Sequence, residues 1–491
     1  MRSNVQITIW IITFLAASAL SYPWPSQMSC SYGPRGSLTA ICVNATAIYF
    51  KLTNYRFDYM DETLQCLNCS LRSLEQGTFD IPGNEIKTLD IRNSSVTKIW
   101  PKAFIGMIYM ERLLLSNNPI EVVYPEAFLG VRKIKYIGME NTVNHLEPFV
   151  FKELHVLEIL ILSKNKLQEL KPGTFEGLHN LKILDLSYNE LKHVKDCFNP
   201  LVNLKVLKLS HNSIRKVYGN EFNALKTLLL LNLEYNQMFN FTTNISGDNT
   251  LRTLNLGHNS LNALSFKPST FGNLNALEEL DLSDNEFFNI TVRLFQGLYR
   301  LRILNLSKNN ITTINTGSFV GLPHLRVLNI SSNKIHDLKV TGRFSLPSLA
   351  ILDLGKNEIV EFDYMSLIFR TPRLRYIILE DNKLSCKSIS QLQVLFEDDS
   401  IRFLVTEDAG DCPKLNKEQA AELIQKNTEQ MEYRLVNNNL LIWMFVLMTL
   451  VILLIGVLFY VQFFIVLRLG SRPRIRILSN LGLRRTNQQD V

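Results

Sequence analysis

Apolar residues recur along most of the chain in one spacing, LxxLxLxxNxL, in which an asparagine stands between the third and fourth apolar positions. Eleven stretches fit this pattern, and in a twelfth, residues 86–96, Ser94 takes the asparagine position. Two weaker fits, around Leu64 and around Asn141, bring the total to about fourteen units of about 24 residues within residues 61–385. Side chains alternate along a strand, so the LxL centre of each unit predicts a short strand with two leucines on one face. One unit cannot bury that face alone, so the repetition predicts a stack of units around a shared core.

A second stripe supports this register. Ten units carry a phenylalanine about ten residues after the asparagine position, at Phe79, Phe104, Phe128, Phe151, Phe175, Phe198, Phe222, Phe271, Phe295 and Phe319. Its constant phase relative to the leucines predicts a buried ladder rather than an exposed aromatic surface. The unit between Asn236 and Leu251 lacks it, so we expect a locally irregular convex side there.

The repeat resembles the typical 24-residue class of the leucine-rich repeat family. The resemblance implies an α/β-type solenoid, a horseshoe with a parallel β-sheet on its concave side. It also implies that the recurrent asparagine turns the chain off each strand and bonds backbone groups of neighbouring turns, for which an amide has both donors and acceptors.

Seven cysteines are typical of an exported chain. The resemblance places an N-terminal cap at residues 22–60 and a reduced C-terminal cap at 386–412, closed by a Cys386–Cys412 disulfide. Four early cysteines (Cys30, Cys42, Cys66 and Cys69) permit three pairings, among which the sequence does not choose. Cys66 and Cys69 also fall on repeat-core positions, which leaves a free inward thiol at Cys69 as an alternative. Cys197 is expected to be a semi-buried thiol, with an intermolecular disulfide as the alternative.

Both ends of the chain carry apolar segments. Residues 1–21 have a charged start, a short apolar core and a small-residue exit, which predict a secretory signal peptide rather than a buried helix. Residues 440–467 contain no charged side chain and are long enough to span a bilayer as a C-terminal transmembrane helix. Residues 413–439 predict a helical stalk. In the tail, 468–491, six arginines and one aspartate account for five of the seven net positive charges. Positive residues stay cytoplasmic, so we expect a single-pass type I protein of the plasma membrane, with the N-terminus outside.

This placement of charge changes the meaning of the basic composition. The ectodomain is left nearly neutral, so the net charge does not favour nucleic acid as a partner. The sequence contains no HExxH motif, phosphate-binding glycine loop or paired CxxC zinc motif. We therefore expect a non-enzymatic protein without cofactor or metal.

Candidate recognition residues lie in the solvent-facing position just before the asparagine. In four consecutive units this position holds Tyr188, His211, Tyr235 and His258. Strands about 4.8 Å apart would align these side chains into a ladder roughly 15 Å long. Aromatic side chains of this kind suit protein recognition, and histidine would add pH sensitivity. The alternative is an ordinary polar surface. Nearby acids (Glu278, Glu279, Asp281 and Asp284) indicate either a surface for a cationic partner or a solvated face.

Nine N-x-S/T sequons lie before the predicted membrane span and none after it: Asn44, Asn68, Asn93, Asn240, Asn244, Asn289, Asn305, Asn310 and Asn329. Asn305 and Asn329 are expected to face out from the concave strands. Glycans there would direct protein partners toward the Tyr188–His258 ladder.

The expected function is recognition of an extracellular protein, or of a glycan, by a cell-surface protein without its own signalling domain. The ectodomain resembles those of Toll-like and adhesion-type receptors and, more loosely, the transmembrane leucine-rich immune proteins of mosquitoes. An adhesion role, an innate-immune role and an accessory subunit of a signalling receptor remain open, and a co-receptor or a second copy of the chain is a further candidate partner.

Overall fold

The computed structural model describes residues 29–32, 36–52, 60–242, 250–266, 270–292, 294–314, 317–338, 346–361, 367, 370–385 and 402–404. The chain divides into two units, Met1–Leu415 and Asn416–Val491, and every described residue belongs to the first. The predicted signal peptide, the Cys386–Cys412 bridge, the stalk, the membrane span and the tail lie outside the described residues, as does Asn244. Within the described ranges, no helix has the length and apolar character needed to cross a membrane.

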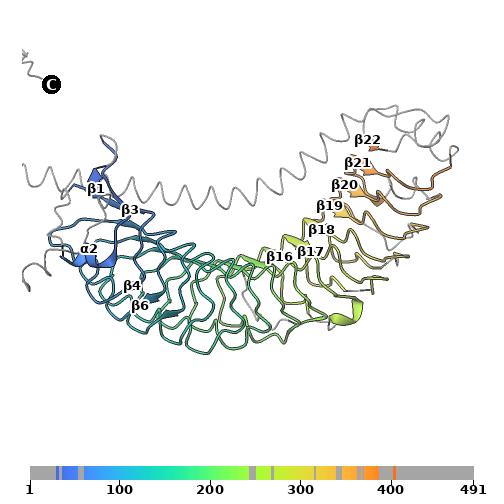
Figure 1. Ribbon diagram of the computed structural model, residues 1–491. Helices are drawn as coiled ribbons and strands as arrows, with labels where there is room; N and C mark the ends of the chain where they lie inside the picture. The colour runs from blue at the N-terminus through green and yellow to red at the C-terminus, as the bar shows by residue number, and fades with distance from the viewer. Residues whose placement is uncertain are drawn as a thin grey trace, which may run out of the picture. The chain divides into compact units, whose positions relative to one another are not determined.

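Fourteen described strands between residues 63 and 378, one for each predicted repeat, pair in parallel (Figure 1). They line the inner edge of the part of the chain that spans Met1–Leu415. In chain order they are β3 (Thr63–Leu67), β5 (Thr88–Asp90), β7 (Arg112–Leu114), β9 (Tyr136–Gly138), β10 (Ile159–Ile161), β11 (Ile183–Asp185), β12 (Val206–Lys208), β14 (Leu230–Asn232), β16 (Thr253–Asn255), β17 (Glu279–Asp281), β18 (Ile303–Asn305), β19 (Val327–Asn329), β20 (Ile351–Asp353) and β21 (Tyr376–Ile378). The solenoid with a parallel concave sheet is therefore confirmed.

The strands are short because only the xLx centre of each repeat pairs with the neighbouring repeats. Leu160 and Leu207, for example, are each fully buried between two half-buried neighbours, and Leu184 lies in register with both of them. β22 (Arg402–Leu404) continues the sheet beyond β21. Two smaller sheets line the flank. One contains β4 (Ser73–Leu74), β6 (Lys98–Ile99) and β8 (Val122–Val123), and the other contains β13 (Lys216–Val217) and β15 (Asn240–Phe241). A 3-10 helix, η1, spans Ala263–Ser265.

The N-terminal end of the sheet begins with an antiparallel pair, β1 (Ser29–Tyr32) and β2 (Thr39–Val43), followed by the helix α2 (Ala47–Leu52). β2 pairs in parallel with β3 and so joins this hairpin to the repeats. Cys30 and Cys42 lie opposite each other in the hairpin and form a disulfide. Cys66 and Cys69, which the sequence grouped with the cap cysteines, are buried thiols because they occupy repeat-core positions.

In the eleven units that carry it, the asparagine bonds backbone groups of two turns, as the family resemblance implies. Asn189 Nδ2 donates to the carbonyl oxygens of Leu162 (2.9 Å) and Leu186 (3.0 Å), and its Oδ1 accepts from the Leu167 amide (3.1 Å). The same carbonyl bonds recur at Asn118, Asn165, Asn212, Asn236, Asn259, Asn285, Asn309, Asn333, Asn357 and Asn382.

One unit departs from the expected asparagine. Asn141 is exposed, and the buried Thr142 takes the inward position, with its hydroxyl donating to the carbonyls of Leu115 (3.3 Å) and Glu140 (2.8 Å). The interpretation centred on Asn141 was wrong by one residue. This unit is one residue short, because Val143 already bridges to Ile120 of the preceding turn.

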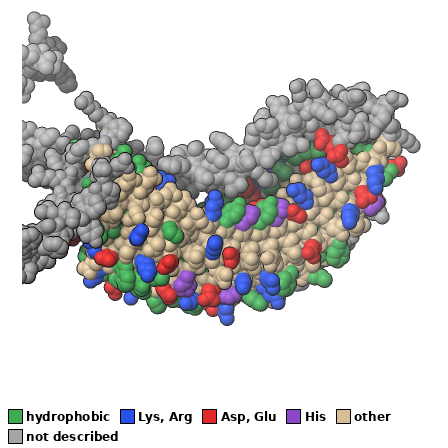
Figure 2. Space-filling view, in the orientation of Figure 1, with side chains coloured by type: hydrophobic (Ala, Val, Ile, Leu, Met, Phe, Trp, Pro, Cys, Tyr) green, Lys and Arg blue, Asp and Glu red, His purple; other side chains and the backbone are tan. Residues whose placement is uncertain are grey.

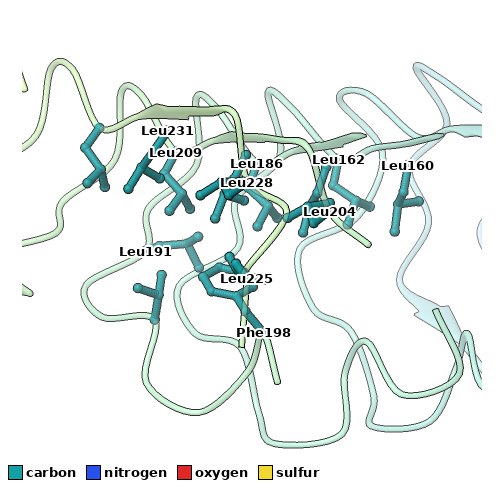
Figure 3. Packing of buried hydrophobic residues seen from close by; sticks show 14 of the residues in the cluster. Leu160, Leu162, Leu186, Leu191, Phe198, Leu204, Leu209, Leu225, Leu228 and Leu231 are labelled. Carbon is teal, nitrogen blue, oxygen red and sulfur yellow. The ribbon is translucent and has the colours of Figure 1, made fainter. Parts of the chain in front are cut away.

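The phenylalanine stripe forms the outer half of the core. All ten rings are buried, with at most 3% of any exposed, which confirms the predicted ladder. Neighbouring rings stack, for example Phe104 on Phe128 at 5.7 Å and Phe198 on Phe222 at 6.1 Å between centroids. Figure 3 shows leucines such as Leu186 and Leu204 pointing inward beneath the strands, with Phe198 on the side away from the sheet. The predicted irregular convex stretch falls mostly on residues 243–249, outside the described ranges.

Candidate functional site

Tyr188, His211, Tyr235 and His258 form a continuous stack of rings at the carboxyl ends of β11, β12, β14 and β16. Their centroids are 4.0, 4.2 and 3.8 Å apart, and neighbouring ring planes differ by 9–10°. We call these four residues the aromatic ladder. Both tyrosines remain exposed, Tyr188 by 49% and Tyr235 by 42%. Figure 2 shows this row of alternating green and purple side chains on the surface of the middle repeats.

The backbone explains why the rings are parallel. Each ladder residue has a positive φ, between 52° and 55°, because the chain turns off the strand there. The same left-handed turn recurs in neighbouring units, for example at Lys164 and Asp284, so the conformation belongs to the repeat rather than to the aromatic residues. A non-glycine residue in this region costs about 1–2 kcal/mol. Each stacked pair stabilises the fold by about 0.5–1.5 kcal/mol beyond the burial of its side chains, which partly offsets that cost.

Charged residues border the ladder. At one end, His258 Nδ1 lies 2.6 Å from Asp284 Oδ2. Desolvation, followed by the proximity of His258, holds the pKa of His211 below its usual value. Glu234, beside Tyr235, accepts from Asn255 Nδ2 at 3.0 Å, and burial together with the nearby Asp281 raises the pKa of its carboxyl group. The ladder therefore combines aromatic faces with a histidine whose pKa is lowered.

An aliphatic strip accompanies the ladder and was missed by sequence reasoning. The outward residue that opens each strand is aliphatic in four consecutive units, and all four side chains are half-buried: Ile159, Ile183, Val206 and Leu230. The sequence carried the signal, because the same position is polar in several other units, such as those with Thr88, Arg112 and Glu279, although it is aliphatic again at Ile303, Val327 and Ile351. Apolar side chains on the sheet beside exposed aromatic rings make a surface suited to another protein.

The acidic residues do not act as a free acidic patch. Glu278 lies 3.1 Å from Arg302 and 3.9 Å from Arg252, and Asp284 pairs with His258. The structure thus favours the solvated, internally paired interpretation over a docking surface for a cationic partner. Among the described residues, no group of three or more His, Cys, Asp or Glu side chains is arranged to hold a metal ion.

Cys197 is 1% exposed, and its Sγ donates to the Val194 carbonyl at 3.2 Å. Burial raises the pKa of its thiol. A hydrogen bond to Cys69, followed by burial, raises the pKa of the Cys66 thiol. These thiols face the core and lie away from the ladder.

The sequon asparagines differ in exposure. Asn68, Asn93 and Asn310 are exposed, whereas Asn44, Asn240, Asn289, Asn305 and Asn329 are half-buried. Asn305 and Asn329 face out from the concave strands β18 and β19, as expected. Asn305 Nδ2 donates to Asp281 Oδ2 at 3.2 Å, so a glycan there would be attached to a nitrogen that already makes a hydrogen bond.

Comparison with known proteins agrees with this architecture. The family described as Leucine rich repeat matches residues 84–146, 139–191, 155–214, 192–238, 276–335 and 323–384, and a further Leucine Rich Repeat match covers residues 250–274. These matches span more than half of the chain, which therefore belongs to the leucine-rich repeat family. No curated protein is significantly similar to the chain in sequence.

Several solved structures share the fold. A leucine-rich repeat protein of Leptospira interrogans is 24% identical, with a TM-score of 0.57 over 74% of this chain and 88% of that one. A TLR13–ssRNA13 complex gives 22% identity and a TM-score of 0.62 over 74% of this chain and 56% of that one. The LRIM1/APL1C complex gives 19% identity and a TM-score of 0.53 over 89% and 82%. At these identities the likeness concerns the fold alone.

Proposed function

We propose that this protein is a non-enzymatic cell-surface recognition protein that binds an extracellular protein through the concave side of its repeats, centred on the aromatic ladder. The observation that carries the proposal is the pre-stacked row of four rings, in which both tyrosines are exposed. Leucine-rich repeat solenoids are typically protein-interaction scaffolds, which agrees with this role.

Pre-stacking matters for affinity. A flexible side chain loses rotamer freedom when a partner binds, at about 0.5–1.5 kcal/mol for each. Tyr188, His211 and Tyr235 already pack against one another. Much of their rotamer freedom is therefore lost when the chain folds rather than when the partner binds. The half-buried Ile183, Val206 and Leu230 supply apolar area on the adjoining sheet. Tyrosine is among the side chains that most often dominate interface energies.

The test needs a partner and a matched control. A screen of the purified chain against an array of cell-surface and secreted proteins would identify binders. The double variant Tyr188→Ala/Tyr235→Ala should then weaken binding by about 100-fold, because interface tyrosines often contribute more than 1 kcal/mol each. The control, Tyr218→Ala/Tyr299→Ala, removes two tyrosines that are 65% and 54% exposed outside the ladder and should change affinity less than about twofold. Equal affinities for both double variants would refute the ladder as the binding site.

We further propose that the chain is a type I protein of the plasma membrane, with a signal peptide at 1–21, a span at 440–467 and a cytoplasmic tail at 468–491. Sequence alone supports this arrangement. A stop codon after residue 439 should release the protein into the culture medium, whereas the full chain should remain in the membrane fraction. A full chain that stays soluble after cell lysis and centrifugation would contradict it.

An innate-immune role, or an accessory role beside a signalling receptor, is the second candidate. The shared fold with the TLR13–ssRNA13 and LRIM1/APL1C complexes favours testing it. Binding of the purified chain to microbial surfaces, but to no protein of the cell-surface array, would favour this role over adhesion. Homophilic binding would favour adhesion.

A further inference from the structure

A groove lined mainly by arginines lies at the opposite edge of the concave sheet from the aromatic ladder, where the strands of the later repeats begin. It measures about 320 Å³ and is lined by Glu278, Arg300, Arg302, His324, Arg326, Ser348 and Arg373. We call it the arginine groove. The ladder stands after each strand and the groove before it, so the two surfaces are separate.

The repeat register builds two parallel rows in this groove. Arg302 and Arg326 immediately precede β18 and β19, which pair residue for residue. Arg300 and His324 each stand two positions earlier. The next repeat has the small Ser348 in this outer row, and the one after it has Arg373. Because strands are about 4.8 Å apart, the outer row from Arg300 to Arg373 spans about 14 Å across the strands.

The charge of the groove is largely uncompensated. In the first six repeats, the residue before each strand alternates between glutamate and lysine, and neighbours form ion pairs: Lys87 with Glu62, Lys135 with Glu111 and Lys182 with Glu158. After Glu278 that row contains Arg302, Arg326, Ala350 and Arg375, with no acid. Arg302 pairs with Glu278, whereas Arg300, Arg326 and Arg373 have no carboxylate within ion-pair distance in the part of the chain that the structure describes.

The geometry points to a linear sulfated polysaccharide as the ligand, and we propose that the arginine groove binds one. A guanidinium group binds a sulfate or carboxylate oxygen pair through two parallel hydrogen bonds. Arginines in three of four consecutive repeats suit a chain that carries several anions along its length. No covalent step is involved.

Two observations favour a sulfated sugar over a single-stranded nucleic acid. Nucleic-acid grooves combine basic residues with aromatic platforms for the bases. The outward residues that open the strands beside the groove are aliphatic in three of its four repeats, at Ile303, Val327 and Ile351. The fourth has the single aromatic Tyr376, and the aromatic ladder lies at the other edge of the sheet. The Cys30–Cys42 disulfide is typical of an exported chain, which meets sulfated polysaccharides at the cell surface.

Heparin oligosaccharides provide the probe. Binding of a fluorescent heparin octasaccharide to the purified full chain would be measured at several salt concentrations, together with its fully desulfated counterpart and a single-stranded oligothymidine. We expect the sulfated probe to bind, to weaken steeply with salt and to exceed both comparators. The triple variant Arg300→Gln/Arg326→Gln/Arg373→Gln should weaken binding by at least about tenfold, because each charge-assisted contact strengthens binding severalfold.

A matched control separates the groove from general basicity. The triple variant Arg132→Gln/Lys195→Gln/Lys226→Gln removes the same charge from surface residues elsewhere and should bind the octasaccharide within about twofold of the unmodified chain. Equal losses in both triple variants, or none in the groove variant, would overturn the proposal. So would tighter binding of the oligothymidine that is lost in the groove variant. The Tyr188→Ala/Tyr235→Ala variant should retain octasaccharide binding, which keeps this test independent of the proposed protein-binding function.

Discussion

Replacing Asn309 by alanine tests whether the recurrent asparagines hold the stack of repeats together. Asn309 Nδ2 lies 3.0 Å from the carbonyl oxygens of Leu282 and Leu306 and 3.1 Å from that of Ser307, and Oδ1 accepts from the Phe287 amide at 3.1 Å. An amide nitrogen carries two hydrogens, so the three carbonyl contacts amount to about two donated bonds. With the accepted bond, about three hydrogen bonds are lost, each worth about 1 kcal/mol net.

The expected loss is therefore about 3 kcal/mol, with a further cost because the Phe287 amide is left without this partner. Repeat proteins respond locally, since each unit contacts only its neighbours. Amide hydrogen exchange measured by mass spectrometry is thus the suitable assay. Peptides covering residues 282–311 should exchange on the order of 100-fold faster in Asn309→Ala, if they exchange through local opening.

The adjacent residue provides the control. Asn310 is exposed, and its side chain makes no hydrogen bond within the described residues. Asn310→Ala should leave exchange in the same peptides nearly unchanged. Both variants would be produced in a host without N-glycosylation, because the control also removes a sequon. If the two variants exchange at the same rate, the Asn309 amide does not stabilise the stack.

Three further predictions follow from the ladder, the buried thiol and the sequons. His211 should titrate below the ordinary value of about 6.5, and His258→Ala should raise its pKa. Because the unfolded chain binds this proton more tightly than the folded chain, the contribution of His211 to stability is present above about pH 6.5 and declines as the pH falls below that value. An NMR titration of His211 at or above about 6.5 would contradict this. Cys197 should resist alkylation in the native protein and react after unfolding, as measured by mass spectrometry, whereas labelling of the native thiol or an intermolecular disulfide at this residue would refute its burial. Glycopeptide mass spectrometry should find sugars on Asn305 and Asn329, and bare side chains at both would remove the expectation that glycans exclude protein partners from β18 and β19.

Local pattern was sufficient for most of the fold. The LxL spacing and the phenylalanine phase depend only on which side chains fall on one face, and the ten buried rings from Phe79 to Phe319 agree with that. The pattern failed where register shifts by one residue. Thr142 rather than Asn141 faces inward, because a shortened turn brings Val143 beside Ile120. A search for the motif still finds the repeat after such a shift. A shift of one residue, however, moves a side chain from the core to solvent.

The sequence by itself determined the repeat, its core and the alignment of Tyr188 to His258 in one column, because these follow from periodicity along the chain. The ring stacking, the Cys30–Cys42 pairing and the arginine groove depend on distances between residues that are about 12–95 positions apart in sequence. Only the tertiary structure decided them. When the repeats stack, residues at equivalent positions of successive repeats lie a few ångströms apart. Their rings can then come into contact, and their charges either form pairs or remain exposed.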